Sequence, residues 1–321
     1  MKAVVHAAFG LPDFVELREV ERPVPADDEA LVRVRAASVN PADWYSVVGR
    51  PYVARLAMGL RKPKSDRLGI DFSGTVEAVG SGIRELREGD EVFGGCSGAF
   101  AEYVCVRNAV VAKPANMTFE QAAAVPVAAL TALQGLRDKG ALQAGQHVLV
   151  NGASGGVGTF AVQIAKALGA EVTGVCSTRN VDTIRSIGAD HVIDYTSEDF
   201  TQSDRRYDLV LDVAGSRSWS ELKRVLEPQA TVVLVGAPKG NRVLGPLSHI
   251  VKVRVAALGS GHKVVFFVAK FNKADMEVLR DLLAAGTMTP IIDTQYELSE
   301  IADALRYLGE GHARGKVVIT L

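Results

Sequence analysis

The chain has 321 residues, 48% of them hydrophobic, and its 36 basic and 37 acidic side chains give a formal net charge of −1. This length predicts two domains, each large enough for its own core. A near-neutral charge without basic blocks argues against a general nucleic-acid-binding protein, and no apolar stretch is long enough to span a bilayer. Three cysteines give no disulfide framework. We therefore expect a cytoplasmic protein with no signal peptide and no integral membrane segment.

The first region, from residue 1 to about 120, is predicted to be rich in β-strands. Apolar and polar residues alternate in residues 31–36 and 74–79, as they do in half-buried strands. Further strands are predicted at residues 3–5, 89–93 and 101–106. Glycine and proline residues, which are typical of turns, separate these predicted strands. The region is therefore predicted to form a β-rich domain.

The second region, from about 121 to 256, alternates short apolar strands with amphipathic helices. A helical segment, residues 119–139, leads into it. Strands are predicted at residues 147–150, 171–176, 191–195, 207–213, 230–236 and 253–258, with helices after the first strand and at 180–187 and 218–226. This alternation predicts an α/β fold with a doubly wound parallel sheet, which binds a nucleotide at the carboxyl ends of its strands.

The last region, from about 257 to 321, is too short for a third domain. It is predicted to contain helices at residues 273–285 and 299–308 and a final strand at 315–321. We expect it to pack on the β-rich first region.

A glycine-rich turn follows the first strand of the second region. Gly152, Gly155 and Gly158 are three residues apart, a variant of the commoner G-x-G-x-x-G spacing, and a helix follows at once. Glycines at such a turn let pyrophosphate oxygens approach the N–H groups at a helix N-terminus. The turn predicts cofactor contacts from Gly152, Ser154, Gly155, Gly156 and Val157.

The end of the second strand favours NADPH over NADH. NAD-preferring folds place Asp or Glu there to bind the ribose 2′-hydroxyl. Here the strand runs into Ser177, Thr178 and Arg179, whose hydroxyls and guanidinium are donors suited to a 2′-phosphate. The alternative for Arg179 is an ordinary solvated arginine at a helix start.

The chain resembles the medium-chain dehydrogenase/reductases, in particular their zinc-independent quinone oxidoreductase-like branch and its chloroplast-envelope homologues. The resemblance covers the whole chain and is carried by residues 38–44, 69–74, 87–92, 151–158 and 314–318. It implies a GroES-like β-barrel catalytic domain (residues 1–120 and 257–321), a Rossmann NADPH-binding domain (residues 121–256) and a cleft between them. It also implies hydride transfer to quinones or α,β-unsaturated carbonyl compounds.

The resemblance also implies further cofactor contacts. These are Thr131 near the nicotinamide, Tyr195 beside the adenosine phosphate, Gly236 and Ala237 at the nicotinamide ribose, Phe266 and Phe267 at the carboxamide, and Gly315 and Lys316 on a loop that reaches the cleft. Plain core positions are the alternative for the two phenylalanines.

Neither zinc site of the related alcohol dehydrogenases is expected here. Asn40 stands where those relatives carry a cysteine ligand, and Ile70 stands where they carry the histidine. A structural zinc needs four closely spaced cysteines, and this chain has three scattered ones.

Without a metal, hydrogen bonds must polarise the substrate carbonyl. The delocalised charge of an enolate or a hydroquinone anion suits a few preorganised donors. Asn40 is the first predicted donor, and Tyr45 and Tyr52 are candidate hydrogen-bond or proton donors. The alternatives are a turn-forming Asn40 before Pro41 and tyrosines that merely cover the barrel. Asp43 and Asp71 are expected to be structural.

Residues 50–67 interleave apolar and basic side chains. They suit a substrate lid, a membrane-surface patch or a plain solvated helix. Residues 253–258 and 264–269 are too apolar for an exposed sheet edge, which predicts a homodimer. The rival functions are a non-catalytic NADPH-binding protein and an enoyl reductase for carrier-bound acyl chains.

Overall fold

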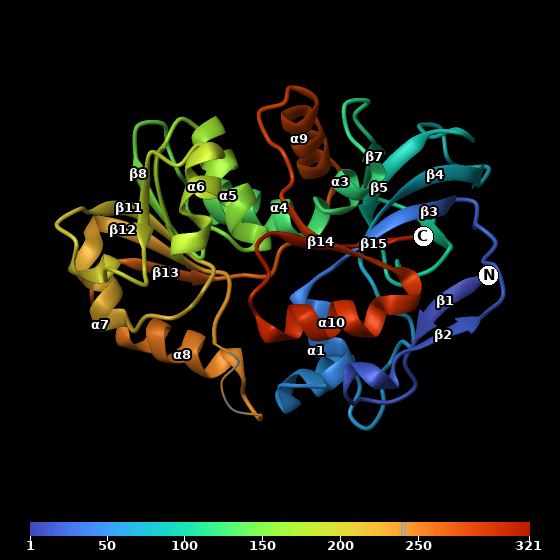
Figure 1. The fold of residues 1–321 in the computed structure, drawn as a ribbon, viewed down its shortest axis with the longest axis horizontal. Helices are drawn as coiled ribbons and strands as arrows, with labels where there is room; N and C mark the ends of the chain where they lie inside the picture. The colour runs from blue at the N-terminus through green and yellow to red at the C-terminus, as the bar shows by residue number, and fades with distance from the viewer. Residues whose placement is uncertain (239, 241) are drawn as a thin grey trace. The chain divides into compact units, whose positions relative to one another are not determined.

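The computed structural model describes residues 1–238, 240 and 242–321, and the chain divides into two compact units (Figure 1). Unit 1 comprises Met1–Leu130 and Lys270–Leu321, and unit 2 comprises Thr131–Ala269. The two boundaries lie 10 and 13 residues after the predicted positions 120 and 256. The last strand of unit 2 comes later in the chain than predicted, which accounts for the second difference.

Unit 1 contains a seven-stranded sheet and a separate pair of strands. The sheet order is β14-β15-β3-β4-β5-β7, with β6 also paired to β3, and β1 pairs with β2. The strands are β1 (Lys2–Val5), β2 (Glu16–Glu19), β3 (Ala30–Val39), β4 (Asp71–Val79), β5 (Glu91–Gly95), β6 (Tyr103–Val106), β7 (Val110–Ala112), β14 (Ile292–Glu297) and β15 (Lys316–Thr320). The predicted return of the tail to the β-rich region is confirmed for Lys270–Leu321, because β15 pairs with β3, whereas residues 257–269 belong to unit 2.

Strand β3 is central to the geometry of the site. It is antiparallel to both β4 and β15, with Ser38 opposite Asp71 on one side and opposite Val318 on the other. The carboxyl end of β3 therefore lies beside the first residues of both neighbours. This register brings together three parts of the chain that are far apart in sequence.

Helices and short turns complete unit 1. They are η1 (Pro12–Phe14), α1 (Pro41–Val48), η2 (Tyr52–Ala54), α2 (Arg55–Met58), α3 (Phe119–Ala123), α9 (Lys273–Ala284), η7 (Leu298–Glu300) and α10 (Ile301–Glu310), while α4 (Pro126–Leu133) crosses the boundary. Helices α1 and α10 pack together in Figure 1. The long helical segment predicted for residues 119–139 is interrupted, because α3 ends at Ala123 and α4 begins at Pro126.

Unit 2 is a doubly wound parallel sheet of six strands, as predicted. Its spatial order, β10-β9-β8-β11-β12-β13, is the 3-2-1-4-5-6 order of dinucleotide-binding sheets. The strands are β8 (His147–Asn151), β9 (Glu171–Cys176), β10 (His191–Asp194), β11 (Tyr207–Asp212), β12 (Leu226–Leu234) and β13 (Lys263–Phe266). The connecting elements are η3 (Gln134–Lys139), α5 (Gly156–Ala167), η4 (Thr178–Asn180), α6 (Val181–Ser186), η5 (Phe200–Gln202), α7 (Trp219–Leu222), η6 (Lys223–Val225) and α8 (Pro246–Ala256).

The strand predicted at residues 253–258 is wrong. This segment contains the end of α8, and the sixth strand is β13. Ile250, Val253 and Ala257 are buried, at helical spacing, whereas Val255 and Leu258 are 59% and 78% exposed. Valine-rich composition suggested a strand, but the burial pattern is that of one helical face.

Candidate active site

The glycine turn of unit 2 has a backbone that only glycine fits. Gly152 has φ +90°, and a Cβ on Gly158 would lie 2.1 Å from the carbonyl oxygen of Gly152. Gly155 is the N-cap residue of α5, and Gly156 and Val157 begin the helix. The first-turn N–H groups of a helix lack partners within it and attract anions. The turn therefore lies at the carboxyl edge of the parallel sheet, with the geometry of a phosphate site.

A buried carboxylate that sequence reasoning missed supports this turn. The side-chain amide of Asn151 and the N–H of Gly215 donate to Asp212 Oδ1 at 2.7 and 2.8 Å. Burial raises the pKa of Asp212 to about 6. Asn151 and Asp212 end the adjacent strands β8 and β11, where the strand order reverses. An Asp at the end of the fourth predicted strand, followed three residues later by Gly215, was the available signal.

The predicted 2′-phosphate contacts lie together after β9. Ser177 precedes η4 and accepts a hydrogen bond from Asn180 at 3.1 Å, and the Thr178 and Thr196 hydroxyls are 2.8 Å apart. Arg179 is exposed, and no ion pair joins it to a described residue. Its guanidinium is available to a ligand.

One carboxylate, Asp194, lies beside these contacts at the end of β10. Hydrogen bonds from Thr178 and Thr196 lower the pKa of Asp194. The predicted preference for NADPH rests on the end of β9, which has no Asp or Glu, and not on the end of β10. The threonine hydroxyls satisfy this carboxylate within the protein.

The remaining predicted cofactor contacts are spread over both units. Thr131 is in α4; Tyr195 is 57% exposed after β10; Gly236 and Ala237 follow β12; Phe266 ends β13 and packs against the core of unit 2; and the Phe267 ring lies 5.8 Å from Lys139 Nζ. Gly315, at φ +132°, precedes β15. Lys316 is the first residue of that strand, so its predicted place on a loop is wrong.

Asn40, the predicted carbonyl donor, is the centre of a buried polar cluster in unit 1. Its side-chain N–H donates to Asp71 Oδ2 at 2.9 Å, and its Oδ1 accepts from Lys316 Nζ at 2.6 Å. Lys316 Nζ is also 3.3 Å from Asp71 Oδ2. Asn40, Asp71 and Lys316 are 2%, 0% and 3% exposed. The antiparallel register of β3 with β4 and β15 brings these three side chains together.

Asp71 is the most heavily hydrogen-bonded member of this Asn40 cluster. Besides the Asn40 amide, the Ser38 hydroxyl donates to Oδ2 at 3.0 Å and the N–H of Val127 donates to Oδ1 at 3.0 Å. Among the described residues, the side-chain nitrogen of Asn40 has one further acceptor besides Asp71, the carbonyl oxygen of Ser38 at 3.4 Å, which is a long and weak contact. The carboxamide is thus held at both ends and has one weakly engaged donor.

Asp43 extends the cluster into α1. Its Oδ2 accepts the backbone N–H of Asn40 at 2.8 Å and thereby fixes the start of the helix. Burial raises the pKa of Asp43 to about 7, although the backbone N–H groups of Asn40 and Gly69 oppose the shift. Its carboxyl group therefore titrates near neutral pH.

The two predicted tyrosines follow Asn40 along the chain. Tyr45 lies in α1 with its ring 5.1 Å from that of Trp44, and burial raises the pKa of its hydroxyl. Tyr52 begins η2 and is 43% exposed, with the Arg55 guanidinium 4.9 Å from its ring.

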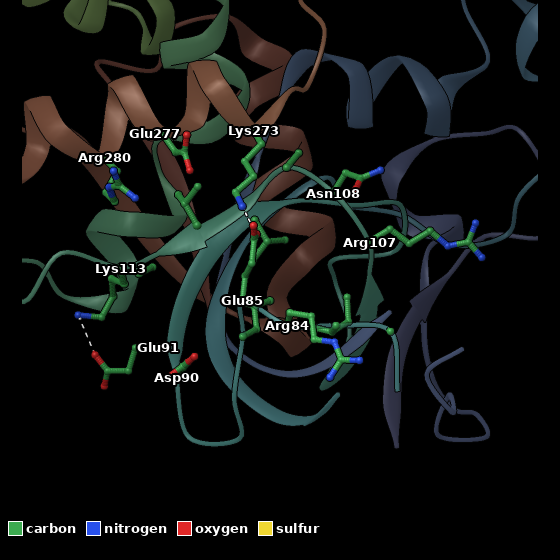
Figure 2. A pocket seen from close by; sticks show the side chains of 17 residues that line it. Arg84, Glu85, Asp90, Glu91, Arg107, Asn108, Lys113, Lys273, Glu277 and Arg280 are labelled. Atoms are coloured by element: carbon green, nitrogen blue, oxygen red, sulfur yellow. Dashed lines mark hydrogen bonds and ion pairs between the residues drawn. The ribbon is translucent and has the colours of Figure 1, made fainter. Parts of the chain in front are cut away.

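A separate groove of about 660 Å³ in unit 1 carries none of the predicted site residues (Figure 2). Its wall joins α9 to the loops that flank β5 and β7 and has both signs of charge. Lys113 pairs with Glu91 at 3.0 Å, and Lys273 pairs with Glu85. These internal pairs satisfy much of its charge.

Among the described residues, no group of three or more His, Cys, Asp and Glu side chains is placed to hold a metal ion. Within the same part of the chain, no helix has the length and apolar character needed to cross a membrane.

Comparisons with known proteins agree with this geometry. Residues 26–116 match the alcohol dehydrogenase GroES-like domain family, and residues 187–319 match the zinc-binding dehydrogenase family. The chain is 33% identical to a 2-methylene-furan-3-one reductase of Solanum lycopersicum, covering 99% of this chain and 79% of that protein. The chain belongs to the medium-chain dehydrogenase/reductase family.

Two further comparisons narrow the resemblance within this family. The chain is 32% identical to the chloroplastic NADPH-dependent alkenal/one oxidoreductase of Arabidopsis thaliana, covering 99% of this chain and 79% of that protein. The structure of the Coxiella burnetii quinone oxidoreductase matches with a TM-score of 0.87 and 31% identity, covering 100% of this chain and 99% of that one. The resemblance to quinone oxidoreductase-like proteins is confirmed, as are the predicted GroES-like and Rossmann-type folds.

Proposed function

We propose that this chain is an NADPH-dependent oxidoreductase that transfers hydride to quinones or α,β-unsaturated carbonyl compounds. The observation that carries the proposal is the glycine turn between β8 and α5, at the carboxyl edge of a sheet with dinucleotide-binding strand order. The names of the tomato, Arabidopsis and Coxiella relatives support this acceptor class.

The residues of unit 2 fit NADPH. A side chain at Gly158 would fill the space in which the turn packs, and the start of α5 offers N–H groups to a pyrophosphate. Arg179, Ser177 and Thr178 supply a cation and hydroxyls for a 2′-phosphate. When bound, NADPH supplies the hydride.

In unit 1, Asn40 is the proposed donor to the acceptor oxygen. Asp71 holds the nitrogen of its carboxamide and Lys316 holds the oxygen, so the group is fixed in place. Its contact with the Ser38 carbonyl is long, at 3.4 Å, which leaves donor capacity for an acceptor oxygen that approaches this fixed amide. A preorganised donor of this kind stabilises charge that develops on oxygen in the transition state. Tyr45 and Tyr52 are the proposed donors of the proton that an enolate needs, whereas a hydroquinone anion takes protons from water.

We also infer that the reaction is independent of zinc, because Asn40 and Ile70 occupy the positions of the family's ligands. A homodimer formed through the edge strand β13 would cover an apolar edge of the sheet. With three cysteines, all free, a reducing compartment such as the cytoplasm suits the chain.

The test is a screen of NADPH oxidation, followed by the loss of its absorbance, with a quinone, an alkenal, an enone and a simple saturated ketone. We expect turnover with the quinone, the alkenal and the enone, and little turnover with the ketone. NADPH should be preferred over NADH, and exhaustive chelation should not reduce the activity. NADPH binding without turnover on any acceptor would instead favour the non-catalytic alternative. Turnover only with carrier-bound acyl chains would favour the enoyl reductase.

A further inference from the structure

We propose that the basic segment, residues 50–67, is a docking surface for an anionic lipid bilayer. The segment holds six basic side chains and one acidic one, Asp66. Its formal charge is therefore +5 (6 − 1), in a chain whose net charge is −1. Such a local excess attracts a negatively charged surface, although the chain as a whole is not attracted.

Two leucines of this segment face solvent. Leu56 and Leu60 are 71% and 68% exposed, and they are four residues apart, around the end of α2. Large apolar side chains near several cations are the combination that inserts at the boundary of headgroups and acyl chains. Exposed leucines alone are common on protein surfaces, so the accompanying charge carries the argument.

The fold holds the leucines outward. Arg55 Nε donates to the Gly49 carbonyl at 2.8 Å, and its guanidinium lies over the rings of Phe9 and Tyr52. The N–H of Lys64 donates to the Met58 carbonyl at 2.7 Å. The Arg55 contacts tie the start of the exposed turn to Gly49 and Phe9, and the Lys64–Met58 hydrogen bond closes the turn on itself. Leu56 and Leu60 are therefore presented on an ordered surface.

Three basic side chains beside the leucines form no ion pair with a described residue. Arg61, Lys62 and Lys64 are exposed, and none forms an ion pair with another residue that the structure describes. Exposed lysines and arginines attract anionic headgroups additively over about a Debye length. An acidic protein would also satisfy the charge, but the bilayer additionally accommodates two leucine side chains without a matching pocket. We therefore commit to the bilayer.

The proposal goes beyond the proposed function and is independent of turnover. Its test is cosedimentation of the full chain with vesicles of phosphatidylcholine alone or with 30% phosphatidylglycerol. We expect binding to the anionic vesicles alone, weakened by added salt. The triple variant Arg61→Glu, Lys62→Glu, Lys64→Glu should weaken it roughly 100-fold or more, at about fivefold for each cation lost.

A matched control reverses three exposed cations elsewhere, Arg87→Glu, Lys223→Glu and Arg224→Glu, and should retain most of the binding. The pair Leu56→Ser and Leu60→Ser tests insertion with the charge intact and should weaken binding. Far-ultraviolet circular dichroism confirms that each variant is folded.

Equal binding by the two charge-reversed variants would overturn the proposal. So would retention on soluble polyglutamate without binding to vesicles, because that result indicates an acidic protein partner. NADPH oxidation with a water-soluble quinone is measured in parallel, and its failure would count against the proposed function but leave the vesicle result standing.

Discussion

Replacement of Lys316 by methionine is the most direct perturbation of the Asn40 cluster. It removes the ammonium that lies 2.6 Å from Asn40 Oδ1 and 3.3 Å from Asp71 Oδ2 and keeps a long side chain in the same space. Because Asp71 is fully buried, its charge would be left with dipolar partners alone. Loss of one member of a buried ion pair costs about 3–5 kcal/mol. Since three hydrogen bonds to Asp71 remain, we expect a loss near the lower end, about 3 kcal/mol.

The two tryptophans of the chain make this loss measurable. Trp44 is in unit 1 and Trp219 is in unit 2. In a Trp219→Phe background, urea unfolding followed by tryptophan fluorescence therefore reports unit 1. With a urea dependence of about 2 kcal/mol per molar, the midpoint should fall by roughly 1.5 M.

Lys273→Met is the matched control. Lys273 pairs with Glu85 at the surface of the same unit, where their side chains are 43% and 73% exposed. We expect a loss below about 1 kcal/mol there. The double variant Lys316→Met, Asp71→Asn should recover part of the loss, because it leaves no uncompensated charge. The coupling between Lys316 and Asp71 would be refuted if the urea midpoint of Lys316→Met were no lower than that of Lys273→Met. Strict additivity of the two losses in the double variant would also refute it.

Three further outcomes are expected. Burial raises the pKa of Asp43 from 3.8 to about 7, so the folded state binds a proton more tightly and unit 1 should lose stability as pH rises from 4 to 7. Urea midpoints should show a flatter profile for Asp43→Asn, and an unchanged profile contradicts the assignment. Arg179→Ala should reduce the ratio of NADPH to NADH affinity about tenfold in titrations with both nucleotides. An unchanged ratio would show that Arg179 is an ordinary solvated residue. Asn40→Ala should lower kcat roughly 100-fold with little change in NADPH affinity, and unchanged turnover on several acceptors would place the donor elsewhere.

The sheet of unit 2 was predictable because its signals are local. Each buried parallel strand is a short apolar run, and the glycine turn lies within eight residues of one of them. The misplaced sixth strand, at residues 253–258, arose where local composition and tertiary burial disagree. Val253 and Val255 favour a strand intrinsically, but a helix buries Val253 and leaves Val255 exposed.

The Asn40 cluster was only partly predictable because strand register creates it. Asn40 was singled out because it stands where the zinc-dependent relatives carry a cysteine ligand. Asp71 and Lys316 lie 31 and 276 residues away, and the pairing of β3 with β4 and β15 brings them to it. Asp71 was interpreted as structural, and the sequence contains no local pattern that specifies this register.

The position of Lys316 separates two roles for one side chain. The resemblance predicts a cofactor contact, for which Lys316→Met should weaken NADPH binding about tenfold or more, since a charge-assisted hydrogen bond would be lost. The structure instead directs the ammonium to Asn40, Asp71 and the Val39 carbonyl. We therefore expect Lys316→Met to leave the NADPH dissociation constant within about twofold and to lower kcat, because the lysine acts through the Asn40 carboxamide. Fluorescence titration of the folded variant measures the first quantity, with Arg179→Ala as the positive control for lost affinity. If Lys316→Met bound NADPH tenfold more weakly, the result would support a cofactor contact for Lys316 and would contradict its role in positioning Asn40.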